Sequence, residues 1–464
     1  LDLRQVRSAS GVSTGVWSAG HHPMSENLHV SRSRVRCLVP EVNYGSTRWA
    51  STRTGDRTGT ATGRHLPHAG HNLLMAVSYS SRSQSVSPFL AMEVMERGMV
   101  MARSGIDIVQ LGVGEPGFPP PLEVVEAVAA AVRAGHTHYT DSRGLYALRE
   151  AIAADCERRR GVRIDPERIV VTSGSSAALL LVCHLLLDPG DEIIIPTPHY
   201  PCYPNMVEVC GGRSVFVPTS PVDGYRIDVD RVRAVVTPRT KGILVASPAN
   251  PTGAVQPSEV MRALSSLGVP VLSDEVYDGL LYDDVTNTSP LGMSDQCFVF
   301  DGFSKRYAMT GFRLGYVIAP ESAIDALVRL QQNLFISTAH FVQTVGLTAL
   351  AQGNAHLEMM RREYATRRTL LVDAVRGLGL SVPVTPTGAF YVLADARHLA
   401  RGRDSLALAF EILDRAHVAL GPGRDFGEIA EGFLRFSFAV DHDDIVRALE
   451  RLARVLPEIA AGVR

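Results

Sequence analysis

Lysine is rare in this 464-residue chain, so the positions of its lysines are informative. Of the 46 lysine and arginine residues, only Lys241 and Lys305 are lysines. Lys305 lies in the glycine- and aromatic-rich stretch DGFSKRYAMTGFRLGY, at the end of the predicted strand CFVFDGFS. Arginine stays charged at any usable pH, whereas a lysine whose surroundings lower its pKa can act as an amine nucleophile. We predict this role for Lys305 and a plain surface position for Lys241.

Two groups that could bind anions follow other predicted strands. In TSGSSAALLL a strand ends at Thr172, and a helix then opens with three small residues, Gly174, Ser175 and Ser176. Free backbone amides, two hydroxyls and a positive helix end would suit a phosphate, although a serine N-cap is the simpler alternative. Arg313 has glycines on both sides, which leave its guanidinium room to reach an anion. Its alternative is an ordinary surface arginine.

Two further polar groups end predicted strands. In LSDEVYDGL a very apolar strand ends with Asp274 and Glu275, followed by Tyr277. A carboxylate buried there needs a positive partner or several hydrogen bonds, and no cation precedes it locally. A bound cationic group is therefore one interpretation, and a helix N-cap is the other. In SPANPTG the proline after Asn250 favours an extended backbone that holds the amide outward, but alone this is a turn signal.

All of these groups share one location in the predicted fold. Strands alternate with helices from about residue 87, which predicts an α/β fold with a mostly parallel sheet and helices on both faces. In such sheets ligands bind outside the carboxyl ends of the strands. Pyridoxal phosphate would use the whole set. Its aldehyde needs a lysine, and its ring nitrogen needs an acid. Its phosphate needs backbone dipoles and an arginine.

The combination of GFSKRYAMTGFRLGY with NPTG and SDEVY resembles the class I/II aminotransferases, the fold-type-I family of pyridoxal-phosphate enzymes. The likeness runs in order and without large gaps from Ser87 to Val455. It implies catalytic roles for Lys305, Asp274 and Tyr277. Lys305 would form the imine link to the cofactor and move the proton between the substrate Cα and the cofactor C4′, while Asp274 would pair with the protonated pyridine nitrogen.

The resemblance also implies how cofactor and substrate are held. Asn250 and Tyr277 would hydrogen-bond the phenolic O3′ of the cofactor. Tyr200 would stack on the cofactor ring, with plain core packing as its alternative. Gly114, Asn250 and Arg435 would bind the substrate, Arg435 through a bidentate contact to the α-carboxylate. The phosphate would be held by a group of small residues and one cation: Gly174, Ser175, Ser176, Ser304 and Arg313.

Three stretches depart from familiar members of the family. Gly302 stands where some members carry a serine near the phosphate. Arg424 and Asp425, in GPGRDFG, stand where small or uncharged residues are common; we expect both to face solvent, and contact with the substrate side chain is the alternative. The segment 332–343 is unusually aromatic, which suggests that it forms an apolar pocket for the substrate side chain.

The chain divides into four predicted parts. Residues 1–74 are rich in Ser, Thr, Gly, Arg and His without a sustained period, which predicts a disordered leader, either an over-extended start or a transit-like segment. We expect residues 75–118 to be an N-terminal segment that packs with a small domain. Residues 119–330 would form the large cofactor-binding domain, and residues 331–464 the smaller α+β C-terminal domain.

Charge and cysteine usage limit the partners. Residues 1–74 carry nine arginines and four acidic residues, so the rest of the chain is acidic, which argues against nucleic-acid binding. The longest apolar run, Ala177–Leu187, is too short to span a membrane. The six cysteines show no paired spacing, which predicts reduced thiols in the cytoplasm and neither disulfides nor a metal site. Tyr139 matches the family tyrosine that reaches the phosphate of a neighbouring subunit, which implies a homodimer.

We therefore predict an aminotransferase that moves the α-amino group of an L-amino acid to a 2-oxo acid in a ping-pong cycle. A lyase that breaks a C–S or another β- or γ-bond is the nearest alternative, because it would use the same lysine, aspartate and arginine. A transcription regulator with an aminotransferase-like sensor domain is a more distant one, because residues 1–74 lack the helical period of a helix-turn-helix. The binding groups address features that all amino acids share, so the reaction class is clearer than the substrate.

Overall fold

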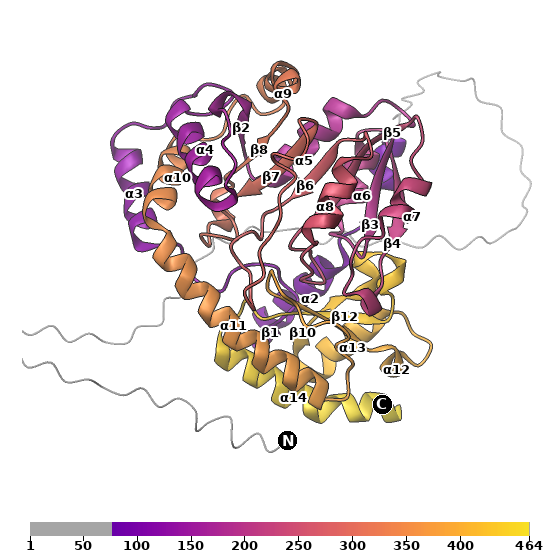
Figure 1. Cartoon of the computed structure of the whole chain (residues 1–464). Helices are drawn as coiled ribbons and strands as arrows, with labels where there is room; N and C mark the ends of the chain where they lie inside the picture. The colour runs from indigo at the N-terminus through magenta and orange to yellow at the C-terminus, as the bar shows by residue number, and fades with distance from the viewer. Residues whose placement is uncertain (1–76, 464) are drawn as a thin grey trace, which may run out of the picture. The chain divides into compact units, whose positions relative to one another are not determined.

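A seven-stranded sheet is the largest element of the computed structural model, which describes residues 77–463 (Figure 1). Its strand order is β2-β8-β7-β6-β5-β3-β4. Strand β8 runs antiparallel to β2 and β7, and the remaining neighbours pair in parallel. The strands are β2 (Ile169–Thr172), β3 (Glu192–Thr197), β4 (Arg213–Pro218), β5 (Thr240–Ala246), β6 (Val271–Asp274), β7 (Cys297–Gly302) and β8 (Gly315–Ile318). The predicted α/β class with a mostly parallel sheet is confirmed.

Both faces of this sheet are covered, which explains why its central strands are apolar at nearly every position. Successive residues of a strand point to opposite faces. Thus Val170 packs in a cluster with helices α5, α6 and α9, whereas Ile169 packs on the other face against α4 and α10. The helices around the sheet are α3 (Leu122–Arg133), α4 (Tyr146–Arg160), α5 (Ser175–Leu186), α6 (Cys202–Val209), α7 (Val229–Ala234), α8 (Ser258–Ser265), α9 (Glu321–Leu334) and α10 (His340–Gln352).

The C-terminal part contains a second, smaller sheet with order β11-β12-β9, antiparallel throughout. Its strands are β9 (Tyr391–Asp395), β11 (Gly421–Pro422) and β12 (Phe433–Ser437), within the part for which the sequence predicts an α+β domain. The long helices α11 (Asn354–Gly377) and α14 (His442–Ala461) lie side by side beneath them in Figure 1. The remaining helices of this part are α12 (Arg397–Ala400) and α13 (Ser405–Ala416).

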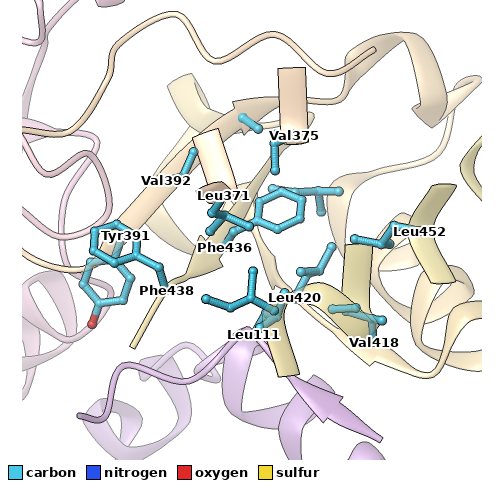
Figure 2. Packing of buried hydrophobic residues seen from close by; sticks show 14 of the residues in the cluster. Leu111, Leu371, Val375, Tyr391, Val392, Val418, Leu420, Phe436, Phe438 and Leu452 are labelled. Atoms are coloured by element: carbon cyan, nitrogen blue, oxygen red, sulfur yellow. The ribbon is translucent and has the colours of Figure 1, made fainter. Parts of the chain in front are cut away.

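Residues N-terminal to the large sheet join this C-terminal part. Short helix α1 (Ser81–Ser85) is followed by α2 (Leu90–Arg103), and strand β1 (Val109–Gln110) pairs in parallel with β10 (Val418–Ala419). Leu111 then packs in the same buried cluster as Leu420, Phe436 and Leu452 (Figure 2). The pairing places the segment after β1 next to β12, where Arg435 lies.

The predicted boundaries at residues 118 and 330 remain predictions, and the predicted leader of residues 1–74 lies outside the described residues. Lys241, predicted at the surface, has a side chain that is 40% exposed and pairs with Asp191. Over residues 77–463, no helix has the length and hydropathy that a membrane span requires.

Candidate active site

A pocket of about 270 Å³ lies at the carboxyl ends of strands β5, β6 and β7. Asp274 and Gly302 are the last residues of β6 and β7, and Asn250 follows β5 by four residues. The pocket wall contains most of the residues predicted to bind cofactor or substrate: Gly114, Ser175, Ser176, Tyr200, Asn250, Asp274, Tyr277, Ser304, Lys305, Arg313 and Arg435. Residues spread over more than 300 positions of the chain thus meet at one place.

Lys305 is half-buried in this pocket and contacts the N-terminal segment. Its Nζ donates a hydrogen bond to the carbonyl oxygen of Gly114 at 2.6 Å. Burial lowers the pKa of Lys305 to about 8; Glu115 opposes that shift, and the cations Arg313 and Arg435 add to it. Near neutral pH a substantial minority of the amine is therefore neutral and nucleophilic, as the chemistry predicted for Lys305 requires.

Asp274 is a buried carboxylate without a cationic partner among residues 77–463. Its Oδ2 accepts from the Tyr203 hydroxyl at 2.6 Å and its Oδ1 from the backbone N–H of Val276 at 3.2 Å. Burial raises the pKa of Asp274 to about 6, with these two hydrogen bonds opposing the shift. The neighbouring carboxylate differs, because Glu275 pairs with Arg160 at 2.7 Å. Of these two carboxylates, only Asp274 thus still lacks the cationic partner that the sequence predicts.

An anion cradle lies at the start of helix α5. Gly174 caps the helix with a φ of 86°, a backbone conformation that residues with a Cβ rarely adopt. A Cβ at Gly174 would also lie 2.6 Å from Nη2 of Arg313, so a larger residue there would displace the guanidinium. Arg313 itself has a left-handed φ of 53°, and its Nη1 donates to the Thr310 carbonyl. The helix start, the hydroxyl-bearing Ser175 and Ser176, and the cation Arg313 thus border the same pocket, an arrangement that suits an anion.

Arg435 on strand β12 is buried, and its donors are only partly used. Nη1 donates to Oδ1 of Asn250 at 2.8 Å, and Nη2 donates to the Gly112 carbonyl at 2.6 Å. Nε has no hydrogen-bond partner among the described residues. The guanidinium carbon lies 4.4 Å from the ring centre of Tyr391 and 4.7 Å from that of Phe426, which restrict its position. A fixed guanidinium with unused donors suits a carboxylate.

Two tyrosines form a hydrogen-bonded pair beside Lys305. The hydroxyls of Tyr277 and Tyr391 lie 2.7 Å apart, and burial raises the pKa of both phenols. The ring of Tyr391 belongs to the buried cluster of the C-terminal part, with its oxygen at the cluster edge (Figure 2). A Cβ at Gly114 would come well under 3.0 Å from that oxygen, so residue 114 must be glycine for this arrangement.

A buried network of charges supports the strand ends from behind. Arg160 of α4 pairs with Glu275, and Arg159 pairs with Asp301 of β7 at 2.9 Å. Arg306, next to Lys305, pairs with Asp155 of α4 at 2.6 Å. Because each carboxylate is paired, the network ties β6, β7 and the lysine loop to one helix. Two further acidic or hydroxyl groups join it, Asp278 and Tyr316.

Two predictions about charged and aromatic residues need correction. Arg424 is exposed, as predicted, but Asp425 is 8% exposed and does not face solvent. Its two carboxylate oxygens accept from the backbone N–H groups of Leu90 and Ala91, both at 3.0 Å, so it caps helix α2. Within the single chain the segment 332–343 does not line the pocket of Lys305: Phe335 and Phe341 pack against the hydrophobic clusters of the large sheet, and Phe341 also borders a separate depression that includes Arg313.

Tyr139 lies apart from the pocket within the described chain. Its side chain is 79% exposed and borders a separate surface depression formed with residues 337–341. Tyr139 was predicted to reach a neighbouring subunit, which a single chain does not test. It follows α3, whose apolar residues Leu122 and Val125 are also exposed, by 67% and 47%.

Sequence reasoning missed several residues of the pocket wall, among them two tyrosines and two apolar residues of α2. Tyr391 and Tyr203 contact predicted residues, but their own stretches, AFYVLADA and PHYPCYP, indicate only a strand and a turn. Phe89 and Met92 line the pocket from the start of α2. Their signal is weak, since an apolar residue at the start of an amphipathic helix is ordinarily a core residue.

The donor set fits pyridoxal phosphate. The cradle at Gly174 and Arg313 offers donors to a phosphate, and Asp274 lacks the cation that a protonated ring nitrogen would supply. Lys305 offers an amine with a lowered pKa, and Tyr200 offers a ring whose edge contacts are made by Phe89 and Tyr203 at 6.0 and 5.4 Å. Each chemical feature of the cofactor has a matching group.

Comparison with known proteins places this arrangement in a family. The family model described as aminotransferase class I and II matches residues 106–452. The aspartate/prephenate aminotransferase of Thermus thermophilus is 39% identical over 384 residues, covering 81% of this chain and 98% of the relative. The arginine–pyruvate transaminase of Pseudomonas aeruginosa is 35% identical over 375 residues, covering 80% and 95%.

Solved structures agree. The Thermus thermophilus aspartate aminotransferase with maleate superposes with a TM-score of 0.78 at 39% identity, covering 82% of this chain and all of that one. The aromatic aminotransferase from Pyrococcus horikoshii has a TM-score of 0.73 at 36% identity, covering 79% and 99%. The chain belongs to the class I and II aminotransferase family and is a transaminase.

Proposed function

We propose that this aminotransferase works with pyridoxal phosphate and moves an α-amino group from an L-amino acid to a 2-oxo acid in a ping-pong cycle. The observation that supports the proposal most is the convergence of one amine, one unpaired carboxylate and two guanidinium groups on a single pocket. When bound, pyridoxal phosphate supplies an electron sink for the charge left on the substrate Cα. The protein must then bind, orient and move protons.

Lys305 is the residue proposed to move the proton at the substrate Cα. Its pKa of about 8 leaves roughly a tenth of the amine neutral at pH 7, which a general base requires. The Gly114 carbonyl accepts a hydrogen bond from Nζ of Lys305. When that bond breaks, the amine is free to turn toward the substrate. Removal of the amine should therefore stop the reaction and leave the other binding groups in place.

Asn250, Tyr277 and Asp274 are proposed to bind the cofactor ring. Because Oδ1 of Asn250 accepts from Arg435, its Nδ2 remains to donate to the phenolic oxygen, as Tyr277 also would. Asp274 would keep the proton on the ring nitrogen, and that cation would relieve the buried negative charge of the carboxylate. Ser175, Ser176 and Ser304 would bind the phosphate together with Gly174 and Arg313.

Arg435 and Gly114 are proposed to bind the substrate carboxylate. Arg435 still has free donors, and two aromatic rings fix its position. Binding of a carboxylate therefore costs little conformational entropy of the arginine side chain. An arginine-to-lysine change at this position would remove the forked geometry while keeping the charge.

We also propose a homodimer in the cytoplasm. Exposed apolar side chains on α3 and the exposed Tyr139 that follows support a second copy as the partner of this surface. The five cysteines among the described residues are free thiols, which supports a reducing compartment.

The test is the absorbance spectrum of the purified protein with pyridoxal phosphate, before and after addition of amino acids. The expected result is a visible band that Lys305→Ala abolishes and that some amino acids convert to the ultraviolet band of the aminated cofactor. A band that no amino acid converts would overturn the transfer reaction. Release of ammonia with a 2-oxo acid in place of conversion would favour elimination.

A further inference from the structure

The known relatives differ in the amino acid that their names give, so the family alone does not fix the substrate of this chain. Their names specify aspartate and prephenate, arginine with pyruvate, and aromatic substrates. A carboxylate or guanidinium on a substrate side chain needs an oppositely charged group or several hydrogen bonds when it is buried. The charges around the pocket therefore limit the side chain that the site accepts.

The charged residues of the pocket wall are all assigned by the proposed function. Within the described part of the chain, they are Asp274, Lys305, Arg313 and Arg435. Asp274 faces the ring nitrogen, Lys305 exchanges with the amino group, Arg313 binds the phosphate and Arg435 binds the α-carboxylate. No cation or carboxylate of this wall remains to pair with a charged substrate side chain.

Three apolar side chains line the pocket from segments that pack near Arg435: helix α2 contacts β11, and Gly421 of β11 pairs with Arg435. Val113 follows Gly112, whose carbonyl accepts from Arg435 at 2.6 Å, and Val113 lines the pocket. Phe89 and Met92 line it from the start of α2. The side chain and the carboxylate leave the same Cα, so a substrate held by Arg435 projects its side chain into this neighbourhood.

The carboxylate that contacts the first residues of α2 is already used. Asp425 precedes β12, the strand that carries Arg435, and the charges of the two side chains interact. Both of its oxygens accept from the first N–H groups of α2 and it is 8% exposed, so it is not free to bind a basic side chain. The cap instead fixes the start of α2, and thereby the positions of Phe89 and Met92.

Met92 has the exposure expected of a wall that a ligand covers. Its side chain is 39% exposed although it borders the pocket, and the ring of Phe89 packs edge-on against Tyr200. An apolar substrate side chain would remove Met92 from water, whereas a charged one would lose its own hydration there without a partner.

We propose that the amino donor of this enzyme is an amino acid with an uncharged, apolar or aromatic side chain, and that Phe89 and Met92 of α2 form the wall that selects it. This proposal rests on the proposed function. Dicarboxylic and basic amino acids are disfavoured donors, because the wall offers their side chains no partner.

The experiment measures the single-turnover conversion of the cofactor-loaded enzyme by single amino acids, which avoids any choice of oxo acid. The donors are phenylalanine, leucine and methionine against aspartate, glutamate, arginine and lysine. We expect the best apolar donor to exceed every charged donor by at least about tenfold in kcat/KM, the discrimination typical of an apolar pocket. A charged donor that equals or exceeds it overturns the proposal, including the case in which a second copy supplies the pairing charge.

Two matched variants test the wall itself. Met92→Arg places a cation at the pocket, while Met99→Arg places one on the same helix at a residue that is 48% exposed and does not line the pocket. We expect M92R to raise the aspartate-to-phenylalanine ratio of kcat/KM by at least about tenfold and M99R to leave it unchanged. Equal ratios in both variants overturn the role of α2. Loss of conversion with every donor in the unmodified enzyme would instead refute the proposed function.

Discussion

Gly114→Ala should damage the active site through one identifiable contact. The new Cβ would lie well under 3.0 Å from the hydroxyl oxygen of Tyr391, and the next atom, Cζ, would lie at 3.3 Å. Tyr391 cannot withdraw easily, because its ring is packed in a buried cluster (Figure 2) and the guanidinium of Arg435 lies 4.4 Å from the ring centre. The segment that carries Gly114 must shift instead, and with it the carbonyl that accepts from Lys305.

The size of the effect follows from that geometry. Overpacking of a fixed site costs about 1–3 kcal/mol, which is about 5- to 150-fold in a rate constant if the site bears all of it. Tyr391→Phe alone loses the hydrogen bond to Tyr277, worth about 0.5–1.5 kcal/mol or about 2- to 12-fold. In the double variant the hydroxyl that causes the clash is missing, and the remaining 3.3 Å contact needs a shift of a few tenths of an ångström.

The double variant therefore should be about tenfold more active than Gly114→Ala alone, even though it carries one substitution more. The assay is the single-turnover reaction of the loaded enzyme with its best amino donor, with thermal unfolding as the check that all three variants are folded. If the losses of G114A and Y391F simply multiply in the double variant, the contact between residues 114 and 391 is not the cause, and the reasoning fails.

Three further predictions concern buried charges. Burial raises the pKa of Asp274 from 3.8 to about 6, so the cofactor-free protein loses stability as pH rises between these values. Asp274→Asn should remove up to about 3 kcal/mol of that loss above pH 6, measured by urea unfolding at several pH values. The same substitution should abolish transamination. Arg160→Met leaves Glu275 buried without its cation and should destabilise the protein by about 3–5 kcal/mol; R160M/E275Q should unfold at a higher urea concentration than R160M. Asp425→Asn weakens the cap of α2, a loss of about 0.5–2 kcal/mol, and should raise KM for apolar donors several-fold with kcat nearly unchanged; an unchanged KM would contradict the positioning role.

The sheet and most of the pocket could be predicted because both depend on local patterns. Apolar runs such as CFVFDG and VLSD identify strands buried on both faces, and ligand groups of α/β sheets follow the strands in sequence. Lys305, Asp274 and Asn250 each lie at or shortly after a strand end, so the rule that locates the site also locates these residues. The family resemblance then supplied Arg435 and Gly114, which no strand-end rule would select.

The residues that escaped prediction are held by contacts between distant parts of the chain. Asp425 caps a helix that begins more than 330 positions earlier, and a local reading of GPGRDFG gives it no reason to be buried. Tyr391 lies 114 positions from its partner Tyr277. In each case the polar group is satisfied by an element that packs beside it only in the folded chain, so neither charge nor period along the sequence indicates the pairing.

The residues proposed to carry the reaction and those proposed to select the substrate are held in place by different parts of the chain. The groups proposed to act on the amino and carboxylate ends lie at the strand ends of the large sheet and on β12, beside buried ion pairs and aromatic rings. The apolar wall instead begins a helix whose N-terminus is held by one carboxylate, and Met92 on it is more than one-third exposed. Changes in that wall should alter which side chain is accepted without disturbing Lys305 or Asp274. Residues 89 and 92 are therefore the positions at which substitutions should change the substrate while preserving the chemistry.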